Sequence, residues 1–478
     1  MVVLCGCGVT VSLMHTLVVP LLPDISRIMG LSQDSASWLL TITMLAGAVC
    51  APMAGRLGDM VGKRKVLAAA LGLMAIGSMV GAVAGSFALL LVARALQGAA
   101  FGVLPLGISI LKDELPEDRI MAGTATMSST LGVGGAIGMP LAGVIAQLMS
   151  WHAVFWAATA TSLAMLVLVV VFVPESPVRS GGRFDVVGAA GLATGLVALL
   201  LAVSQGARWG WASLPTLGLF GGSALVLAVW SVHQLRVRSP LVDLRTSTQP
   251  VVLLTNLATT LVGVGMFASF MLTPLQLQAP TATGYGFGLT VMLAGVCMVP
   301  TGLGMLFFSP VSAKVSARHG AHVTLLSGAL VMFVANIGAA MLPGSLPVLL
   351  CVLMLLSIGA ALCFSAMPTL IMNWVPVTET ASANSLNALL RTIGTSSCAA
   401  IGGTFLAAFT MDVGGERVAS ATGFTVTYWL AAGCSLTAAG LAAAVTLVVR
   451  RTARRLAEVT EVTELDGGTG GTGVDLVA

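Results

Sequence analysis

The chain has 478 residues, of which 57% are hydrophobic and only 8% are charged, and its mean hydropathy is +1.00. A soluble globular domain carries about 25% charged residues and a disordered chain has a low hydrophobic content, so both classes are excluded. The net charge of +4 does not indicate nucleic-acid binding, because the basic residues are scattered at the ends of apolar stretches.

Fourteen apolar stretches are each long enough to cross a bilayer as a helix, which takes about 20 residues. Proline and glycine recur inside them, as is typical of helices packed in a membrane bundle. The N-terminal stretch has neither a basic leader nor a small-residue cleavage site, so we expect a span rather than a signal peptide. In chain order the stretches lie at 2–22, 35–55, 66–85, 87–111, 122–147, 153–173, 187–205, 214–234, 252–275, 287–311, 322–342, 346–371, 384–409 and 425–449.

The distribution of Lys and Arg predicts the orientation of these spans. Of the 22 basic residues, 17 lie in loops on one side, three lie on the other side, and Arg94 and Arg391 lie inside spans. The positive-inside rule therefore predicts a multi-pass protein of the cell membrane with both termini in the cytoplasm. Residues 451–478 are polar and end in a Gly/Thr-rich run, which predicts a disordered cytoplasmic tail.

One segment returns eight spans later in a degraded form. Residues 55–63 read GRLGDMVGK and residues 313–321 read AKVSARHGA. A six-helix half repeated in the same orientation, with two helices inserted between the copies, produces this offset. We therefore expect an N-terminal six-helix lobe over residues 1–173, two linker transmembrane helices with flanking cytoplasmic loops over 174–248, and a C-terminal six-helix lobe over 249–450.

The first copy of this segment, extended to GRLGDMVGKRK at 55–65, resembles the cytoplasmic loop signature of the major facilitator superfamily. Its glycines allow close approach of helices, and Asp59 can lie at a helix N-terminus beside basic residues. Such a group can act as a conformational latch that is made and broken. The candidate latch residues are Gly55, Arg56, Gly58, Asp59, Gly62, Lys63 and Arg64.

Further segments resemble one branch of that superfamily, the fourteen-span drug:proton antiporters. Arg94-Ala-Leu-Gln97-Gly98 resembles an intramembrane arginine motif. A run in the fifth span resembles the Gly/Pro motif of antiporters, and segments at 150–156, 208–211 and 240–244 agree with this branch. The resemblance implies an all-α major-facilitator fold of 14 transmembrane helices and export of hydrophobic or cationic compounds, antibiotics among them. The Gly/Pro residues are Gly134, Gly138, Pro140 and Gly143.

The first span departs from the pattern of this branch. Met14 and Val19 stand where the branch usually has Asp and Asn, and none of the 18 acidic residues is expected at mid-membrane depth. A buried carboxylate is a common proton carrier in membrane pumps. A histidine titrates near pH 6.5 and can take that part. The proton-coupling candidates are therefore His15, Arg94, Asp24 and Asp34.

Polar and adaptable side chains inside spans are candidates for the wall of a substrate cavity. Each of them could equally bond a neighbouring helix, and Arg391 could extend its charge to the cytoplasm. The sequence has no phosphate-binding loop, no catalytic triad and no metal-ligand cluster, so we expect no enzyme activity, no cofactor and no metal. The cavity candidates are Met14, Thr16, Thr41, Gln97, Asn256, Gln276 and Arg391.

These features together predict a monomeric secondary active transporter that exports small hydrophobic or amphiphilic compounds by alternating access and proton antiport. Its expected partners are the small-molecule substrate, protons and the lipid bilayer, without nucleic acid. Two alternatives stay open: an importer or facilitator of a small metabolite without proton coupling, and a non-transporting membrane sensor. The sensor is disfavoured because no loop holds an output domain.

Overall fold

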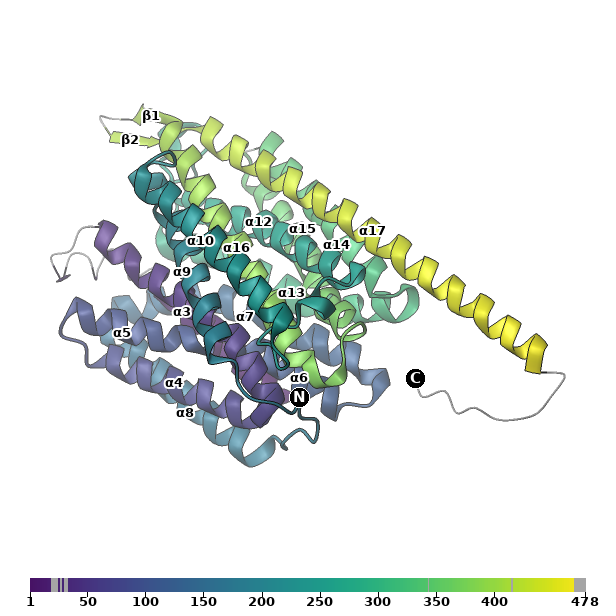
Figure 1. Ribbon diagram of the computed structural model, residues 1–478. Coiled ribbons are helices and arrows are strands. Elements are labelled where there is room, and N and C mark those ends of the chain that lie inside the picture. Colours follow the sequence, from purple (N-terminus) through teal and green to yellow (C-terminus); the bar gives the residue numbers. More distant parts are fainter. Residues whose placement is uncertain (19–24, 26–27, 30–32, 343, 414–415, 468–478) are drawn as a thin grey trace.

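The computed structural model describes residues 1–18, 25, 28–29, 33–342, 344–413 and 416–467, which form a bundle of long helices with one small hairpin (Figure 1). The first half of the chain, residues 1–173, holds the helices α1 (Val2–Leu17), α3 (Gln33–Val61), α4 (Lys63–Ala82), α5 (Phe87–Gly98), α6 (Val103–Glu114), α7 (Glu117–Leu148) and α8 (His152–Phe172). Residues 174–248 hold α9 (Val186–Trp209), α10 (Leu214–Arg236) and the short α11 (Leu244–Ser247).

The second half, residues 249–450, holds α12 (Pro250–Gln278), α13 (Val291–His319), α14 (Ala321–Met341), α15 (Leu346–Met372), α16 (Thr380–Ala408) and most of α17 (Ala421–Gly467). Strands β1 (Thr410–Val413) and β2 (Glu416–Ala419) pair antiparallel between α16 and α17. This hairpin had no expected counterpart in the sequence. It lies at the end of the bundle away from the two chain termini (Figure 1).

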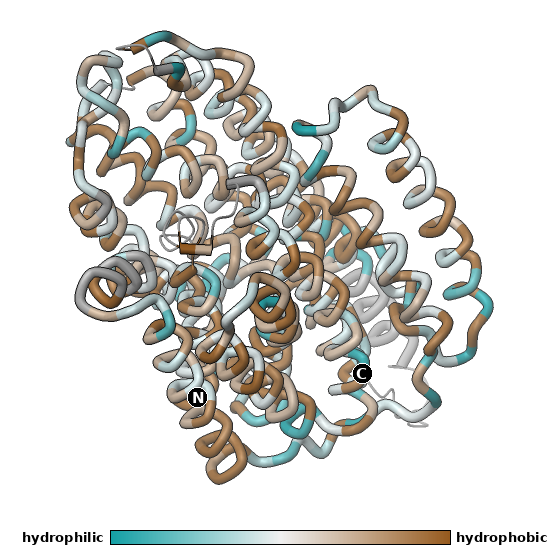
Figure 2. Tube along the Cα trace, turned by 90° about the vertical axis from the view of Figure 1, so that its left-hand side faces the viewer, coloured by the Kyte–Doolittle hydropathy of each residue, from teal (hydrophilic) through white to brown (hydrophobic). Residues whose placement is uncertain are grey.

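Eleven helices of the described residues are long and apolar enough to cross a membrane, and α1 is a shorter apolar helix. Hydrophobic residues run along the helices, whereas hydrophilic residues gather mostly at their ends and in the connections (Figure 2). The mainly helical architecture expected of a membrane protein is therefore confirmed, while the number of fourteen spans stays a prediction.

The stretch expected as one helix at 87–111 is not uniform. It begins as α5, tightens into a 3-10 turn over Ala99–Gly102, and continues as α6. Pro105 explains the break, because it has no N–H to donate to the carbonyl of Phe101, four residues earlier. The 3-10 turn presents Phe101 toward α3, where the ring lies against Gly47.

Buried apolar side chains form one large cluster in each half. The first joins helices from α1 to α8 and also includes Met372 of α15 and Ala381 of α16, and the second joins helices from α12 to α17. A third joins α9 and α10 to α3 and α16. Leu131 of α7 packs against both large clusters, so α7 lies where the halves meet. Figure 1 shows α4, α5 and α8 on one side and α12, α14, α15 and α17 on the other.

The tail expected to be disordered from residue 451 is helical for its first part. Helix α17 continues without interruption to Gly467. Residues 451–466 contain Arg, Ala, Leu and Glu but neither Gly nor Pro, so nothing in them stops a helix that has already formed. Gly467 is the last residue of α17 that the structure describes. Residues 468–478 lie outside the described part of the chain.

Candidate functional site

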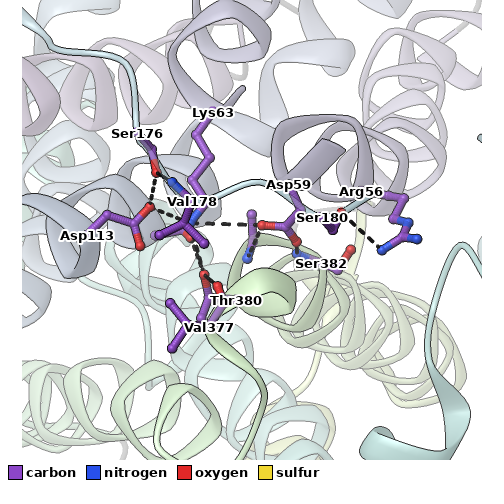
Figure 3. A network of polar contacts seen from close by, with 12 residues as sticks. Arg56, Asp59, Lys63, Asp113, Ser176, Val178, Ser180, Val377, Thr380 and Ser382 are labelled. Atoms are coloured by element: carbon purple, nitrogen blue, oxygen red, sulfur yellow. Dashed lines mark hydrogen bonds and ion pairs between the residues drawn. The ribbon is translucent and has the colours of Figure 1, made fainter. Parts of the chain in front are cut away.

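The end of the bundle that carries the basic loops is called here the basic end. It contains the C-terminal ends of α3, α6 and α15 and the N-terminal ends of α4, α7 and α16. There, Asp59 of α3 accepts hydrogen bonds from the backbone N–H groups of Ala381 (3.2 Å) and Ser382 (2.8 Å) in the first turn of α16 (Figure 3).

These two bonds make Asp59 an N-terminal cap for a helix of the other half of the chain. The N–H groups of a first helical turn have no partner inside the helix, and they form the positive end of its dipole. The residue that precedes α16, Glu379, makes no side-chain capping bond of its own. The carboxylate of Asp59 therefore supplies both the missing acceptors and the favourable charge.

Lys63, at the start of α4, lies between two carboxylates and the same helix. Its Nζ is 2.5 Å from Oδ2 of Asp113 and 4.0 Å from Oδ1 of Asp59, and it donates to the hydroxyl of Thr380 at 3.1 Å (Figure 3). All three charged side chains are fully buried. We call Asp59, Lys63, Asp113, Thr380 and Ser382 the latch.

Three more hydrogen bonds join α6 and α7 to the second half. The hydroxyls of Ser109 and Thr380 are 2.6 Å apart, Lys112 Nζ donates to the carbonyl of Met372 at 2.5 Å, and Ser128 Oγ donates to the carbonyl of Phe364 at 2.8 Å. The first two bonds and the latch close the basic end by polar contacts between the two halves, whereas the third lies deeper, eleven positions after the first residue of α7.

The segment that follows α8 supports the latch from the side of the first half. Ser176 Oγ donates to Oδ2 of Asp113 at 2.6 Å, and the N–H of Ser180 donates to the carbonyl oxygen of Asp59 at 2.6 Å. Glu175 accepts the N–H of Arg64 in the first turn of α4. These contacts hold Asp59 and Asp113 in position on the side of the first half, where Asp59 reaches α16 directly and Asp113 binds Lys63.

Two glycines of the predicted latch motif have specific structural reasons. Gly62 has φ of +126°, a conformation that L side chains rarely adopt. Gly55 faces α16, because a Cβ atom there would lie 2.4 Å from Ser385 Oγ and 2.7 Å from the carbonyl oxygen of Ala381. Any side chain at position 55 would push α3 away from α16.

The closed basic end does not satisfy all of its polar groups. Several buried side-chain atoms there have no hydrogen-bond partner among the described residues, which costs about 1–3 kcal/mol per group. Opening the basic end would give them access to water, so the closed arrangement is stabilised by less than its bonds alone suggest. The atoms are Arg56 Nε, Asp113 Oδ1, Ser382 Oγ, Ser385 Oγ and both polar atoms of the Asn384 side chain.

Two carboxyl groups outside the spans have shifted pKa values. Burial, followed by the negative charge of Asp243, raises the pKa of Glu379, while Arg56 opposes the shift. Burial alone would raise the pKa of Asp185 as well, but hydrogen bonds from the N–H of Gly188 and from two side chains of α10 lower it overall. Asp185 caps α9 and ties it to α10.

Deep in the first half, Arg94 is buried and makes three hydrogen bonds. Its Nε donates to the carbonyl of Leu39 (3.2 Å), and its Nη1 donates to the carbonyl of Met14 (3.4 Å) and to Oε1 of Gln97 (2.7 Å). Gln97 in turn donates to Ser78 at 2.9 Å. Arg94 therefore joins α1, α3 and α5 within one half of the chain.

His15 is half-buried on α1, and its ring meets the ring of Phe101 edge-on with centroids 4.0 Å apart. His15 lies in the last turn of α1. Its partner Phe101 lies in the 3-10 turn between α5 and α6, so this contact places His15 at mid-depth of the bundle, whereas the other four histidines lie near helix ends without such a contact to a mid-span residue. Of the other proton-coupling candidates, Asp24 lies outside the described residues, and so does the side chain of Asp34.

The Gly/Pro motif lies on α7 where this helix packs between α1 and α13. A Cβ atom at Gly134 would lie 2.4 Å from Cβ of Ser12, and one at Gly138 would lie 1.8 Å from Oγ1 of Thr16. On the other side, Pro140 lies against Gly295 of α13. Gly143, the last residue of the motif, belongs to α7, but its packing lies outside the described part of the structure. The motif thus allows α7 to contact both halves closely.

Most of the predicted cavity residues bond to neighbouring helices. Met14, Thr16 and Gln97 are buried in the first half, and Thr16 Oγ1 lies 3.4 Å from the carbonyl of Gly134. Asn256 is buried and accepts a bond from Asn387 at 3.0 Å, whereas Gln276 is buried near the far end of α12. Thr41 is half-buried and bonds within its own helix.

Arg391 is different from these residues. It lies eleven positions after the first residue of α16, its side chain is only partly buried, and its guanidinium carbon is 5.0 Å from the centre of the Phe364 ring. The alternative in which the Arg391 side chain extends its charge to the cytoplasm is not what the structure shows. Its guanidinium lies over an aromatic ring of α15 instead.

Several residues at the basic end were not singled out from the sequence. Asp113, Thr380 and Ser382 complete the latch, while Ser109 and Lys112 extend it. The sequence carried only a weak signal for them. Charged residues directly follow the expected span at 87–111, and hydroxyl-bearing residues directly precede the expected span at 384–409. Asp113 bonds to Lys63, 50 positions earlier, whereas the other four make contacts across more than 250 positions of the chain.

The sequence matches the Major Facilitator Superfamily over residues 4–396 and again over residues 255–466. The multidrug resistance protein Stp of Mycobacterium tuberculosis (strain CDC 1551 / Oshkosh) is 26% identical over 411 residues, which covers 84% of this chain and 75% of Stp.

A second relative in the same strain, the uncharacterized MFS-type transporter MT1926, is 28% identical over 297 residues. That match covers 61% of this chain and 43% of MT1926, so the chain spans less than half the length of this relative. The crystal structure of the human organic anion transporter MFSD10 (TETRAN) superposes with a TM-score of 0.65 at 17% identity, covering 92% of this chain and 98% of that one. This likeness shows the fold alone.

Proposed function

Because the chain belongs to the Major Facilitator Superfamily, a family of membrane transporters, we propose that it exports small hydrophobic or amphiphilic compounds across the cell membrane by alternating access and proton antiport. Export is supported by the name of the relative Stp, a multidrug resistance protein. The chain then acts as a monomer of fourteen spans, with lobes at residues 1–173 and 249–450 and linker helices in 174–248. The basic end and both termini are cytoplasmic.

The latch is the observation that carries this proposal. Polar contacts between the halves concentrate at the basic end, where Asp59 caps α16 and Lys63 lies between Asp59 and Asp113. A helix cap is worth about 0.5–2 kcal/mol, and a shift between two conformations needs only a few kcal/mol. The latch thus stabilises the arrangement that is closed toward the cytoplasm and breaks when the lobes rock.

The helix α7 provides the surface on which the lobes move against each other. It contacts α1 through Gly134 and Gly138 and contacts α13 through Pro140. Small residues on both sides keep this contact close without interlocking large side chains. Rocking of the lobes about α7 would then open one end of the bundle while closing the other.

Proton coupling is assigned to His15. It is the imidazole at mid-depth, it is partly exposed, and the described acidic side chains lie toward the helix ends or in the connections. A histidine that is dehydrated in one arrangement and rehydrated in the other changes its proton affinity with the transport cycle. Asp24 and Asp34, which the sequence predicts at the outer ends of the first two spans, are the alternative coupling sites.

Transport by the purified full-length protein in proteoliposomes tests export and coupling together. The wild-type protein should accumulate a labelled amphiphilic drug against its concentration gradient when a pH gradient is imposed, and accumulation should stop when the gradient is collapsed. A protein that equilibrates no compound across the membrane, with or without the gradient, would rule out the proposed function.

The contact at the basic end and the proton-coupling residue are then tested separately, by substitutions at Gly55 and at His15. Gly55→Leu should separate α3 from α16 and slow export at normal protein abundance, whereas Gly72→Leu, at a glycine of α4 with open space around it, should be neutral. His15→Gln should still exchange substrate but lose gradient-driven accumulation. If accumulation survives His15→Gln and is lost in Asp34→Asn or Asp24→Asn, coupling passes through one of these carboxyl groups instead.

A further inference from the structure

Arg391 lies too deep in the bundle to place its charge in water at the basic end. It follows the first residue of α16 by eleven positions, which is about 16 Å along the helix axis. An arginine side chain reaches less than half that distance. The backbone around it is packed against α12, since a Cβ atom at Gly263 would lie 2.8 Å from the carbonyl oxygen of Arg391.

The guanidinium lies where the two halves of the chain meet. The ring of Phe364 beneath it belongs to α15 and is almost completely buried. The carbonyl of Phe364 accepts the hydroxyl of Ser128, which comes from α7 in the other half. Arg391 is therefore beside the interface along which the lobes are proposed to move, above the polar contacts that close the basic end.

The described residues do not neutralise this charge. A guanidinium has five N–H donors, but Arg391 makes neither a hydrogen bond nor an ion pair with any residue that the structure describes. A cation–π contact with one ring stabilises an arginine by less than its burial at the centre of a membrane costs. The aromatic ring alone therefore does not offset this cost.

The second intramembrane arginine shows what a structural solution looks like. Arg94 is 1% exposed, and it donates three hydrogen bonds, to two backbone carbonyls and to a glutamine of its own half. Arg391 is only partly buried, and no acceptor of the described residues takes up its N–H groups. Its donors are therefore left for a group that comes from outside the protein.

We propose that Arg391 and Phe364 form a subsite for the anionic group and the adjoining aromatic or apolar body of the exported compound. The planar guanidinium fork matches the oxygens of a carboxylate or sulfonate, and the ring supplies apolar contact next to it. The substrates are then amphiphilic anions. This assignment rests on the proposed export function and specifies its substrate class.

Three naphthalene compounds of the same size test it: naphthalene-2-sulfonate, the neutral naphthalene-2-sulfonamide and the cation trimethyl(2-naphthyl)ammonium. Binding to the full-length protein is measured by the ligand-induced shift in unfolding temperature, and exchange is measured in proteoliposomes. The wild-type protein should bind the sulfonate at least about tenfold more tightly than the sulfonamide, a difference of about 1.4 kcal/mol. Arg391→Gln should remove this preference and leave sulfonamide binding unchanged.

Two further variants sharpen the assignment. Arg391→Lys should restore part of the preference, because a point charge replaces the fork. Phe364→Leu should weaken the binding of sulfonate and sulfonamide by similar factors. If Arg391→Gln does not fold, the same binding comparison is made with Arg391→Met. The preference of the wild-type protein for the sulfonate over the sulfonamide is then the second test of the subsite.

The outcomes separate the subsite from the transport function. Preference of the wild-type protein for the sulfonamide or the ammonium compound, or equal losses for all probes in Arg391→Gln, would overturn the subsite. If the subsite is overturned but the protein still exchanges the ammonium compound, the proposed export function remains supported. Tight sulfonate binding without exchange of any compound would support the subsite and overturn export.

Discussion

Charged groups at the basic end bond across the two halves of the chain, whereas the charged groups at mid-depth do not. At the basic end, Asp59 and Lys63 of the first half bond directly to α16 of the second half. At mid-depth, Arg94 bonds only within its own half among the described residues, and Arg391 contacts an aromatic ring. A charge shared between halves can respond to their separation, whereas a charge satisfied within one half only stabilises that half.

The largest effect is expected from the buried lysine of the latch. Lys63→Met leaves two buried carboxylates without a cation, which costs about 3–5 kcal/mol in the closed arrangement. Hydrogen exchange of the amides at 380–385 should rise strongly and export should fail. Lys65→Met is the matched control, because Lys65 is two residues away and exposed. Equal behaviour of the two variants would contradict the assignment of Lys63.

The second effect separates the two arginines. Arg94→Ala removes three hydrogen bonds and leaves a cavity among α1, α3 and α5, so we expect a loss of about 2–4 kcal/mol in stability. Arg94→Lys should recover only part of it. Arg391→Ala should leave the unfolding temperature unchanged or raise it, because it removes an uncompensated charge. A drop for Arg391→Ala as large as that for Arg94→Ala would refute the contrast.

A smaller effect is expected from Asp59→Asn. The amide keeps one acceptor oxygen, so it retains one of two bonds to α16 but loses the charge at the helix N-terminus, a change of about 1–2 kcal/mol. Faster hydrogen exchange at Ala381 and Ser382, with normal protein abundance and reduced export, is the expected result. Unchanged exchange at these two amides would mean that the cap does not hold the basic end.

The smallest effect concerns Asp185, which lies outside the latch and links α9 to α10. Its pKa is lowered in the folded protein, so its stabilisation is present above the ordinary value of about 3.9 and is lost as the pH falls through the folded value. The difference in unfolding temperature between wild-type protein and Asp185→Ala should therefore narrow as the pH drops below about 4. A difference independent of pH would indicate that only the capping geometry matters.

The sequence predicted the parts of the latch that belong to one continuous motif. Asp59 and Lys63 were identified from the spacing of glycine, acid and base in residues 55–65. Their partners were not, because Ala381 lies 322 positions further on and contributes only a backbone N–H. Every residue other than proline has a backbone N–H, so the sequence does not show which one will bond to a distant side chain. Likewise, the sequence did not show that the carbonyls of Met14 and Leu39 accept hydrogen bonds from Arg94.

The sequence by itself determined the membrane class, the positions of the apolar helices and the family resemblance, because these depend on composition and on short motifs read along the chain. Only the tertiary structure decided the roles of the two intramembrane arginines, which look alike in the sequence. Arg94 became a structural bond donor because α1 and α3 bring carbonyls to it. Arg391 was left beside one ring, because the helices around it bring no acceptor from the described residues.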